Sequence, residues 1–227
     1  MICNGENAAG GSGLTPKIVE EIFSAGVDVI TSGDHIWRKK EIFDVIDKFS
    51  CLLRPANFKD FLPGRGFCIK ENKNKKLAVI NALGRVFINT PSLCPFIKVR
   101  DIINSISKEV RCIIVDFHAE ATSEKVAMGY FLAGKVSCVV GTHTHIPTAD
   151  ERIINNYTGY ITDVGMTGGF DSVLGRKKEK VIEHYITDLP QRFEVSNSDL
   201  RLQAVFIEID EDTGRCVNIE RVEKVLG

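Results

Sequence analysis

Several features that define other protein classes are missing from this sequence of 227 residues. It contains no apolar run near the roughly 20 residues of a membrane-spanning helix, and no charged-then-apolar leader at its start. It also has no basic block, because its 29 basic and 30 acidic residues are interspersed. A polymeric nucleic acid partner usually requires a concentrated cationic face. We therefore expect a cytoplasmic protein with no membrane or duplex nucleic acid partner, while a small phosphorylated ligand stays compatible with the composition.

Two kinds of motif are absent as well. The seven cysteines include no Cys-x-x-Cys pair, and their odd number within mostly apolar runs indicates buried, reduced thiols. The glycine-rich segment 5–13 lacks the Gly-Lys-Ser/Thr ending of a P-loop, so phosphate binding by that route is not expected. This segment is either a flexible connector or a backbone stretch that passes close to a site.

The apolar pattern alternates between strand-like runs and amphipathic helices, and 44% apolar residues suffice for a large core. This alternation predicts an α/β fold, and two expected hairpins add antiparallel pairs, so the sheets should be mixed. No repeat, low-complexity tract or linker interrupts it, which favours a single domain over residues 1–227. The predicted strands cover residues 1–4, 27–31, 66–70, 77–81, 112–118, 136–140, 159–163, 202–209 and 216–225, the predicted helices cover 16–25, 39–48, 97–108, 122–133 and 178–187, and 165–169 is a predicted loop.

The most informative segment is 139–145, where an apolar run ends at a glycine and two histidines follow, two residues apart. In an extended segment, residues i and i+2 point the same way, so His143 and His145 can face one centre. Neutral imidazole is the commonest metal ligand at physiological pH. A single histidine after a strand usually caps or hydrogen-bonds, but for this pair we favour a metal site.

Other candidate ligands also follow predicted strands, at the edge where functional residues of α/β sheets collect. Mixed nitrogen and oxygen ligands favour Mn²⁺, Fe²⁺ or Zn²⁺ over Mg²⁺ or a structural zinc. They are too many for one four-coordinate ion, whereas two ions bridged by a carboxylate would use them all and could clamp a phosphoryl group for hydrolysis. Taken singly, the acidic residues are equally compatible with solvated loops, and His184 belongs to the surface of a predicted helix. The candidates are Glu6, Asn7, Asp34, His35 and His118.

Six segments together resemble one known family along essentially the whole chain. The sequence is similar to bacterial YmdB-type metallophosphoesterases of the calcineurin-like superfamily. The resemblance implies a four-layer αββα sandwich, two iron or manganese ions, and hydrolysis of 2′,3′-cyclic nucleotides or similar small phosphodiesters. It also implies assembly into oligomers, but it indicates no substrate-binding residues. The matching segments are 4–9, 33–37, 54–57, 116–125, 141–145 and 162–168.

The resemblance also implies a role for each candidate in the first half of a dinuclear centre. Glu6 would bridge the two metals, with Asn7 and His145 on one ion. His35 would protonate the leaving oxygen, which is a general acid–base role. In the family, a strand with a Gly-Asp motif supplies a further ligand to the ion that Asn7 and His145 would hold. The chain starts after that βα unit, so we expect a truncated gene model in which the other site residues persist.

The second ion would be held by Asp34, His118 and His143. The family usually has asparagine at the position of Asp34. Aspartate still offers an oxygen, but it adds a negative charge that should tighten metal binding and weaken the ion as a Lewis acid. We therefore expect an altered rate or metal preference rather than a loss of activity.

Two alternatives of other classes stay open. The lost aspartate would also fit a non-catalytic or regulatory protein that retains the fold and binds a nucleotide or partner. Metal-dependent amide hydrolases use similar ligand sets and form a third possibility. Metal loading would discriminate against the first alternative, and a comparison of phosphodiester with amide substrates would discriminate against the second.

Overall fold

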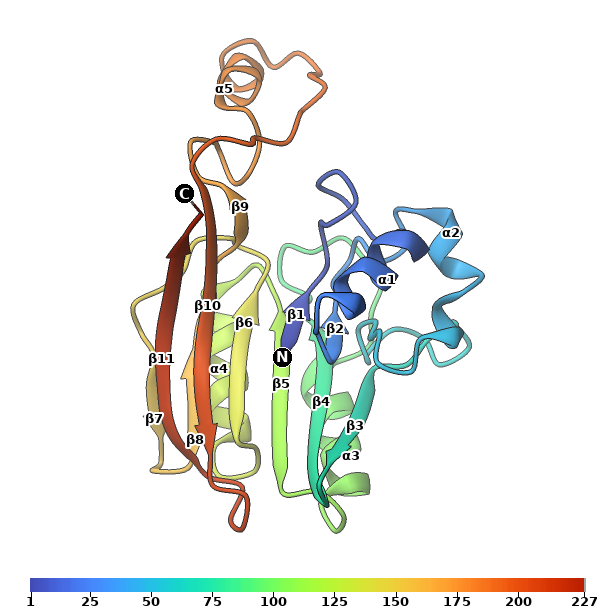
Figure 1. The fold of residues 1–227 in the computed structure, drawn as a ribbon, viewed down its shortest axis with the longest axis vertical. Helices are drawn as coiled ribbons and strands as arrows, with labels where there is room; N and C mark the ends of the chain where they lie inside the picture. The colour runs from blue at the N-terminus through green and yellow to red at the C-terminus, as the bar shows by residue number, and fades with distance from the viewer. Residues whose placement is uncertain (227) are drawn as a thin grey trace.

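The computed structural model describes residues 1–226, and Figure 1 shows its strands and helices. Their order agrees with the predicted alternation, apart from two short strands that the sequence pattern did not indicate. The elements are β1 (Ile2–Asn4), α1 (Pro16–Ser24), β2 (Val29–Thr31), α2 (Lys40–Phe43), β3 (Phe67–Asn72), β4 (Lys75–Leu83), α3 (Pro95–Ile106), β5 (Cys112–His118), α4 (Thr122–Leu132), β6 (Cys138–Thr142), β7 (Arg152–Ile154), β8 (Thr158–Ile161), β9 (Thr167–Gly169), α5 (Lys178–Thr187), β10 (Leu200–Ile209) and β11 (Cys216–Val225).

The largest sheet has six strands in the order β3-β4-β5-β6-β8-β7. Its central strands β4, β5, β6 and β8 are parallel, while β3 and β7 pair antiparallel at the two edges. Helices α3 and α4 cover one face and bury an apolar core that includes Val99, Val115 and Met128. Because β5 and β6 are covered on both faces, all but one of their residues are buried, as is typical of parallel strands.

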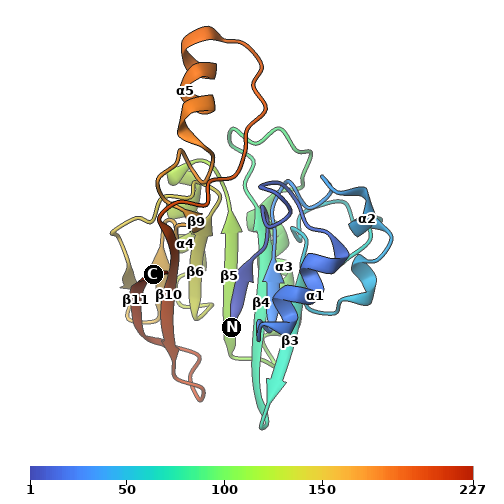
Figure 2. The same ribbon diagram turned by 45° about the horizontal axis from the view of Figure 1, so that its top comes forward.

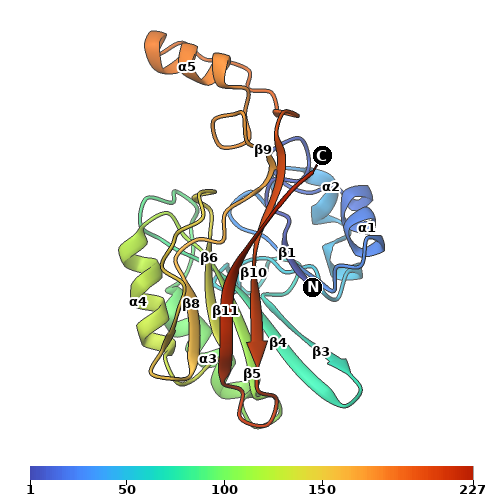
Figure 3. The same ribbon diagram turned by 60° about the vertical axis from the view of Figure 1, so that its left-hand side comes forward.

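Two smaller sheets cover the opposite face. Strands β1 and β2 form a parallel pair, and β11, β10 and β9 form an antiparallel sheet. Apolar residues fill the space between these sheets and the large one, and a further cluster lies under α1 and the segment 36–62. Figure 3 shows the resulting order of layers, with α3 and α4 on one side and α1 and α2 on the other. The mixed-sheet, four-layer αββα prediction is confirmed.

Local sequence signals account for many boundaries. The hydroxyl of Thr15 accepts a hydrogen bond from the backbone N–H of Ile18, and Pro16 occupies the first turn of α1. Gly26, with φ of +95°, follows the helix end as expected. The predicted hairpins form between β3 and β4 and between β10 and β11. Helix α5 has the predicted bounds.

Three expectations were wrong. The helix predicted over 39–48 is broken into α2 and a 3₁₀ turn at Ile46–Lys48, where the Asp47 carboxylate accepts a hydrogen bond from the distant backbone N–H of Gly64. The loop predicted at 165–169 contains β9, which exists because it pairs with residues 200–202 of β10. Among the seven free cysteines only three are buried, so thiol burial was overestimated.

Helix α5 projects beyond the body of the protein, as Figures 1 and 2 show. One face of it carries large apolar side chains at i, i+3 and i+4 that are 50 to 77% exposed: Ile182, Tyr185 and Ile186. Within residues 1–226, no helix combines the length and apolar character required to cross a membrane.

Candidate metal centre

The predicted site residues gather at one end of the sheets, where four strands terminate. Glu6 and Asn7 follow β1, Asp34 and His35 follow β2, and His118 is the last residue of β5. The double-histidine loop follows β6, which is parallel to β5. Figure 2 turns this end of the molecule toward the viewer. Parallel pairing therefore brings together side chains from four distant segments, as the sequence predicted.

Asp34, His118 and His143 form the more compact half of the cluster. Each offers a ligand atom, and these atoms lie within 4.8 Å of one another. The Nε2 atom of His118 is 3.6 Å from Asp34 Oδ1, and the Nδ1 atom of His143 is 3.9 Å from the same oxygen. Gly33 permits this approach, because a Cβ at that position would meet the His118 ring at 2.3 Å.

The two imidazoles face each other through atoms that lack protons of their own. His118 Nδ1 donates to the hydroxyl of Thr142 at 3.0 Å, and Thr142 donates in turn to the buried carboxylate of Asp116. His143 Nε2 is 2.9 Å from a carboxylate oxygen of Glu120. With those nitrogens acting as donors, His118 Nε2 and His143 Nδ1 point their lone pairs at each other across 3.0 Å. Such a contact requires a cation between them, either a proton or a metal ion.

Glu6, Asn7, His35 and His145 form the other half. The backbone N–H of His35 donates to Glu6 Oε1 at 2.8 Å, and its Nδ1 lies 3.0 Å from Asn7 Oδ1. The amide nitrogen of Asn7 is 3.3 Å from His145 Nε2. Glu6 Oε1 is 3.5 Å from His118 Nε2, so this carboxylate contacts both halves. All seven predicted residues are thus in one cluster.

Two oxygens in the cluster are buried without a hydrogen-bond partner among the described residues: Glu6 Oε2 and Asp34 Oδ1. An unpaired carboxylate oxygen away from water is costly, unless a cation binds there. The oxygen and imidazole donors match the ligand chemistry of Mn²⁺ or Fe²⁺. The residues present therefore fit a metal centre on structural grounds.

Protonation follows the same pattern of burial and charge. Burial outweighs the neighbouring imidazoles and raises the pKa of Glu6. Asp34 is also desolvated, but contact with His118 and the charge of His35 lower its pKa to about 2. Burial alone would lower the pKa of His118, yet Glu6 and Asp34 together raise it. Burial and the adjacent His118 lower the pKa of His143 to about 4, and burial lowers that of His145.

Several residues around the cluster could not be identified from the sequence pattern. Glu120 and Asp116 orient His143 and His118, as carboxylates commonly orient metal-bound histidines. Both lie in the segment 116–125, but their spacing alone indicated no such contact. His184, the remaining histidine, is on α5 and outside the cluster. It is partly exposed, and its ring packs against that of Phe193.

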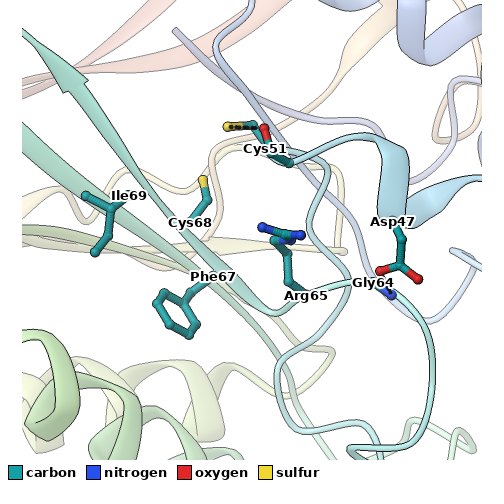
Figure 4. Close-up of a pocket in the computed structure, with 8 residues that line it drawn as sticks. Asp47, Cys51, Gly64, Arg65, Phe67, Cys68 and Ile69 are labelled. Atoms are coloured by element: carbon teal, nitrogen blue, oxygen red, sulfur yellow. Dashed lines mark hydrogen bonds between the residues drawn. The ribbon is translucent and has the colours of Figure 1, made fainter.

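A pocket of about 450 Å³ lies elsewhere, beside β3, and Figure 4 shows its lining. It contains none of the predicted ligands. Its most buried thiol is Cys68, whose pKa rises to about 12 because of burial and the neighbouring Cys51, so it is a weak nucleophile. The lining residues are Asp47, Ser50, Cys51, Gly64, Arg65, Phe67, Cys68 and Ile69.

The histidine assignments predict an unusual titration order in protein treated with a chelator. We expect His118 to protonate as the pH falls, already above its ordinary pKa of about 6.5, and His143 to stay neutral until about pH 4. Because the folded-state pKa of His118 is raised, its stabilising contribution is complete below about pH 6.5 and is lost as the pH rises through the folded value. Histidine NMR titration measures the pKa values of His118 and His143. Protonation of His143 before His118 would contradict the assignment.

Comparison with known proteins agrees with this geometry. A model of the family described as YmdB-like protein matches residues 1–222. The chain is 50% identical to the 2′,3′-cyclic-nucleotide 2′-phosphodiesterase of Bacillus subtilis over 221 residues, which are 97% of this chain and 83% of that protein.

Solved structures give the same result. A phosphatase from Mycoplasma pneumoniae superposes with a TM-score of 0.91 and 37% identity, over 99% of this chain and 81% of that one. A protein described as hypothetical from Thermus thermophilus gives a TM-score of 0.92 and 35% identity, over 99% and 86%. Because the family model matches nearly the entire chain and a relative is 50% identical to it, the chain belongs to the YmdB-like family of metallophosphoesterases.

Proposed function

We propose that this protein is a phosphodiesterase that hydrolyses 2′,3′-cyclic nucleotides or similar small phosphodiesters at a centre of two divalent metal ions, iron or manganese. The observation that supports this most is the clustering of seven residues of ligand type, two of whose buried carboxylate oxygens have no hydrogen-bond partner among the described residues. The 50% identity to a 2′,3′-cyclic-nucleotide 2′-phosphodiesterase supports the substrate class. When bound, such ions would clamp a phosphoryl oxygen and supply an activated water.

Each of the seven clustered residues has a distinct part in this proposal. Asp34, His118 and His143 would hold one ion, Asn7 and His145 would hold the other, and Glu6 would contribute its carboxylate to both. His35 acts as the general acid. Its side chain is 29% exposed and is held by contacts to Glu6, Asn7 and Asp34, so it can reach both substrate and solvent. Residues that bind the nucleoside part are not assigned.

The proposal also covers the domain organisation, the cellular compartment and the size of the substrate. Residues 1–227 act as one metallophosphoesterase domain, because a single cluster of ligands draws on β1, β2, β5 and β6 together. Seven free cysteines suit a reducing compartment such as the cytoplasm. The substrate is a small molecule, since basic and acidic side chains balance over the sequence.

The activity is tested with 2′,3′-cyclic AMP and a generic aryl phosphodiester in the presence of Mn²⁺. Replacing His118→Ala removes a donor from the compact half, and we expect kcat/KM to fall at least about 100-fold, the upper end of what an outer-shell loss costs. His184→Ala is the matched control, because this histidine lies on α5 and should leave the rate unchanged. Preferential hydrolysis of an amide substrate, or equal rates for the two variants, would overturn the proposal.

The charge at position 34 gives a second test. Asp34→Asn removes one negative charge from a carboxylate that contacts His118 and His143. We expect Mn²⁺ affinity to fall about tenfold, because an ion loses the attraction of a unit charge at contact distance. At saturating Mn²⁺ the turnover should rise, since the ion becomes a stronger Lewis acid. Titration calorimetry and steady-state kinetics measure the two effects, and no change in either would refute the electrostatic argument.

The protein also acts as a homo-oligomer in this proposal, with α5 as the contact. The accessible surface is 12028 Å², about 1,700 Å² above the roughly 10,300 Å² expected for a compact monomer of this mass. The charged residues of α5 compensate one another, for example in the Lys180–Glu183 pair, so the helix has no basic face for a membrane.

Mutation of the apolar face of α5 tests this assembly. Light scattering after size exclusion should give the wild type a multiple of 25.2 kDa. Ile186→Asp places a charge in the exposed stripe and should shift the protein to the monomer. Val217→Asp is the control, because Val217 is comparably exposed but lies on β11. A monomeric wild type, or the same shift in both variants, would exclude α5 as the contact.

A further inference from the structure

His143 and His145 both have backbone conformations that non-glycine residues rarely adopt. Their φ angles are +98° and +67°, and one residue, Thr144, separates them. Each such residue costs on the order of 1–3 kcal/mol unless its surroundings hold it in place. The double-histidine loop, residues 143–145, therefore needs an external restraint. The contacts of Thr144 identify one.

Thr144 is held from two sides by a buried ion pair. Its backbone N–H and its hydroxyl both donate to Asp163 Oδ2, at 3.1 and 2.6 Å. Lys125 Nζ lies 2.9 Å from the Thr144 hydroxyl oxygen and 2.9 Å from the same Asp163 oxygen. The second oxygen of Asp163 accepts a bond from the backbone N–H of Gly165. Thus one carboxylate fixes both the backbone and the side chain of Thr144.

The burial of this pair is unusual for a structural contact. The side chain of Lys125 is 1% exposed and that of Asp163 is 0% exposed. Buried ion pairs contribute little net stability compared with apolar residues of similar volume, because both charges must leave water. Neither residue belongs to the ligand cluster. Burial at such a cost is better explained by the geometry it enforces on its neighbours.

We propose that Lys125 and Asp163 are positioning residues that act through Thr144 to hold His143 and His145 in their strained conformations, so that both imidazoles face the metal centre. This inference rests on the proposed metal site for its functional consequence. The backbone supports the same arrangement: Gly141, two residues before His143, lies so close to the carbonyl of Thr162 that a Cβ would be 1.8 Å from its oxygen. The segment 141–145 therefore contacts the segment 162–165 at two points, Gly141 and Thr144.

Thr144→Val is the most informative variant. It removes the hydroxyl but keeps the shape of the side chain and leaves Lys125 and Asp163 paired, whereas Lys125→Met or Asp163→Asn would strand a buried charge and could prevent folding. Thr144→Ser restores the hydroxyl. Thr158→Val is the control, because the hydroxyl of Thr158 also makes two hydrogen bonds but lies on β8, away from the loop.

The first readout is Mn²⁺ affinity by titration calorimetry. We expect Thr144→Val to bind Mn²⁺ at least tenfold more weakly than the wild type, in line with the loss of an outer-shell partner. Thr144→Ser should recover most of this affinity, and Thr158→Val should match the wild type even where its melting temperature falls. A merely structural role of Thr144 would lower the melting temperature of both valine variants and leave both affinities unchanged, which would overturn the proposal.

The second readout needs no metal. Amide hydrogen exchange of residues 142–146 in chelator-treated protein should be at least tenfold faster in Thr144→Val than in the wild type, with no such change in Thr158→Val. Should the wild type bind no Mn²⁺, the proposed metal function fails, and this exchange measurement alone decides the positioning role. Unchanged exchange in the loop would refute it.

Discussion

The rest of the structure depends on one partly buried site in which carboxylate oxygens and imidazole nitrogens lie close together. Asp34, His118 and His143 place ligand atoms within 4.8 Å of one another, Glu6 contacts His118, and two of the carboxylate oxygens have no hydrogen-bond partner among the described residues. Buried oxygens without such a partner are costly to desolvate. The surrounding contacts hold them there nonetheless, through Thr142 and Asp116 on one side and Glu120 on the other. The fold thus stores an electrostatic cost that a bound cation would relieve.

The architecture supplies this cluster through parallel strand ends and close backbone approaches. Register places Leu83, His118 and Thr142 at neighbouring positions on β4, β5 and β6. Each following loop therefore starts beside the others. Glycine then occupies the tightest positions: Gly33 accommodates the ring of His118, and Gly141 accommodates the carbonyl of Thr162. In both cases the chain gains proximity that any side chain at the glycine would block.

The features of this arrangement that depend on local signals could be predicted from the sequence. Capping by Thr15, the two hairpins and the bounds of α5 follow from residue type and periodicity. The ligand-type residues were recognisable because they follow apolar strands. Strand β9 was not, since Thr167–Gly169 has little strand character and forms only against β10. Nor did the sequence pattern reveal Lys125 and Asp163, because a helical lysine is usually solvated, and its burial is decided by tertiary packing.

The two halves of the cluster are unequal, and this asymmetry has a chemical consequence. One half has its own carboxylate, Asp34, together with His118 and His143. The other has neutral Asn7 and His145 and shares Glu6. A divalent ion is attracted more strongly by charged ligands than by neutral ones, so the half with Asp34 should fill first. Its ion would be better neutralised by the protein, which leaves the ion held by Asn7 and His145 with more of its charge to attract an anionic phosphodiester. On this reasoning, the half with Asp34 would bind a metal ion more tightly, and the half with Asn7 and His145 would attract the anionic substrate more strongly.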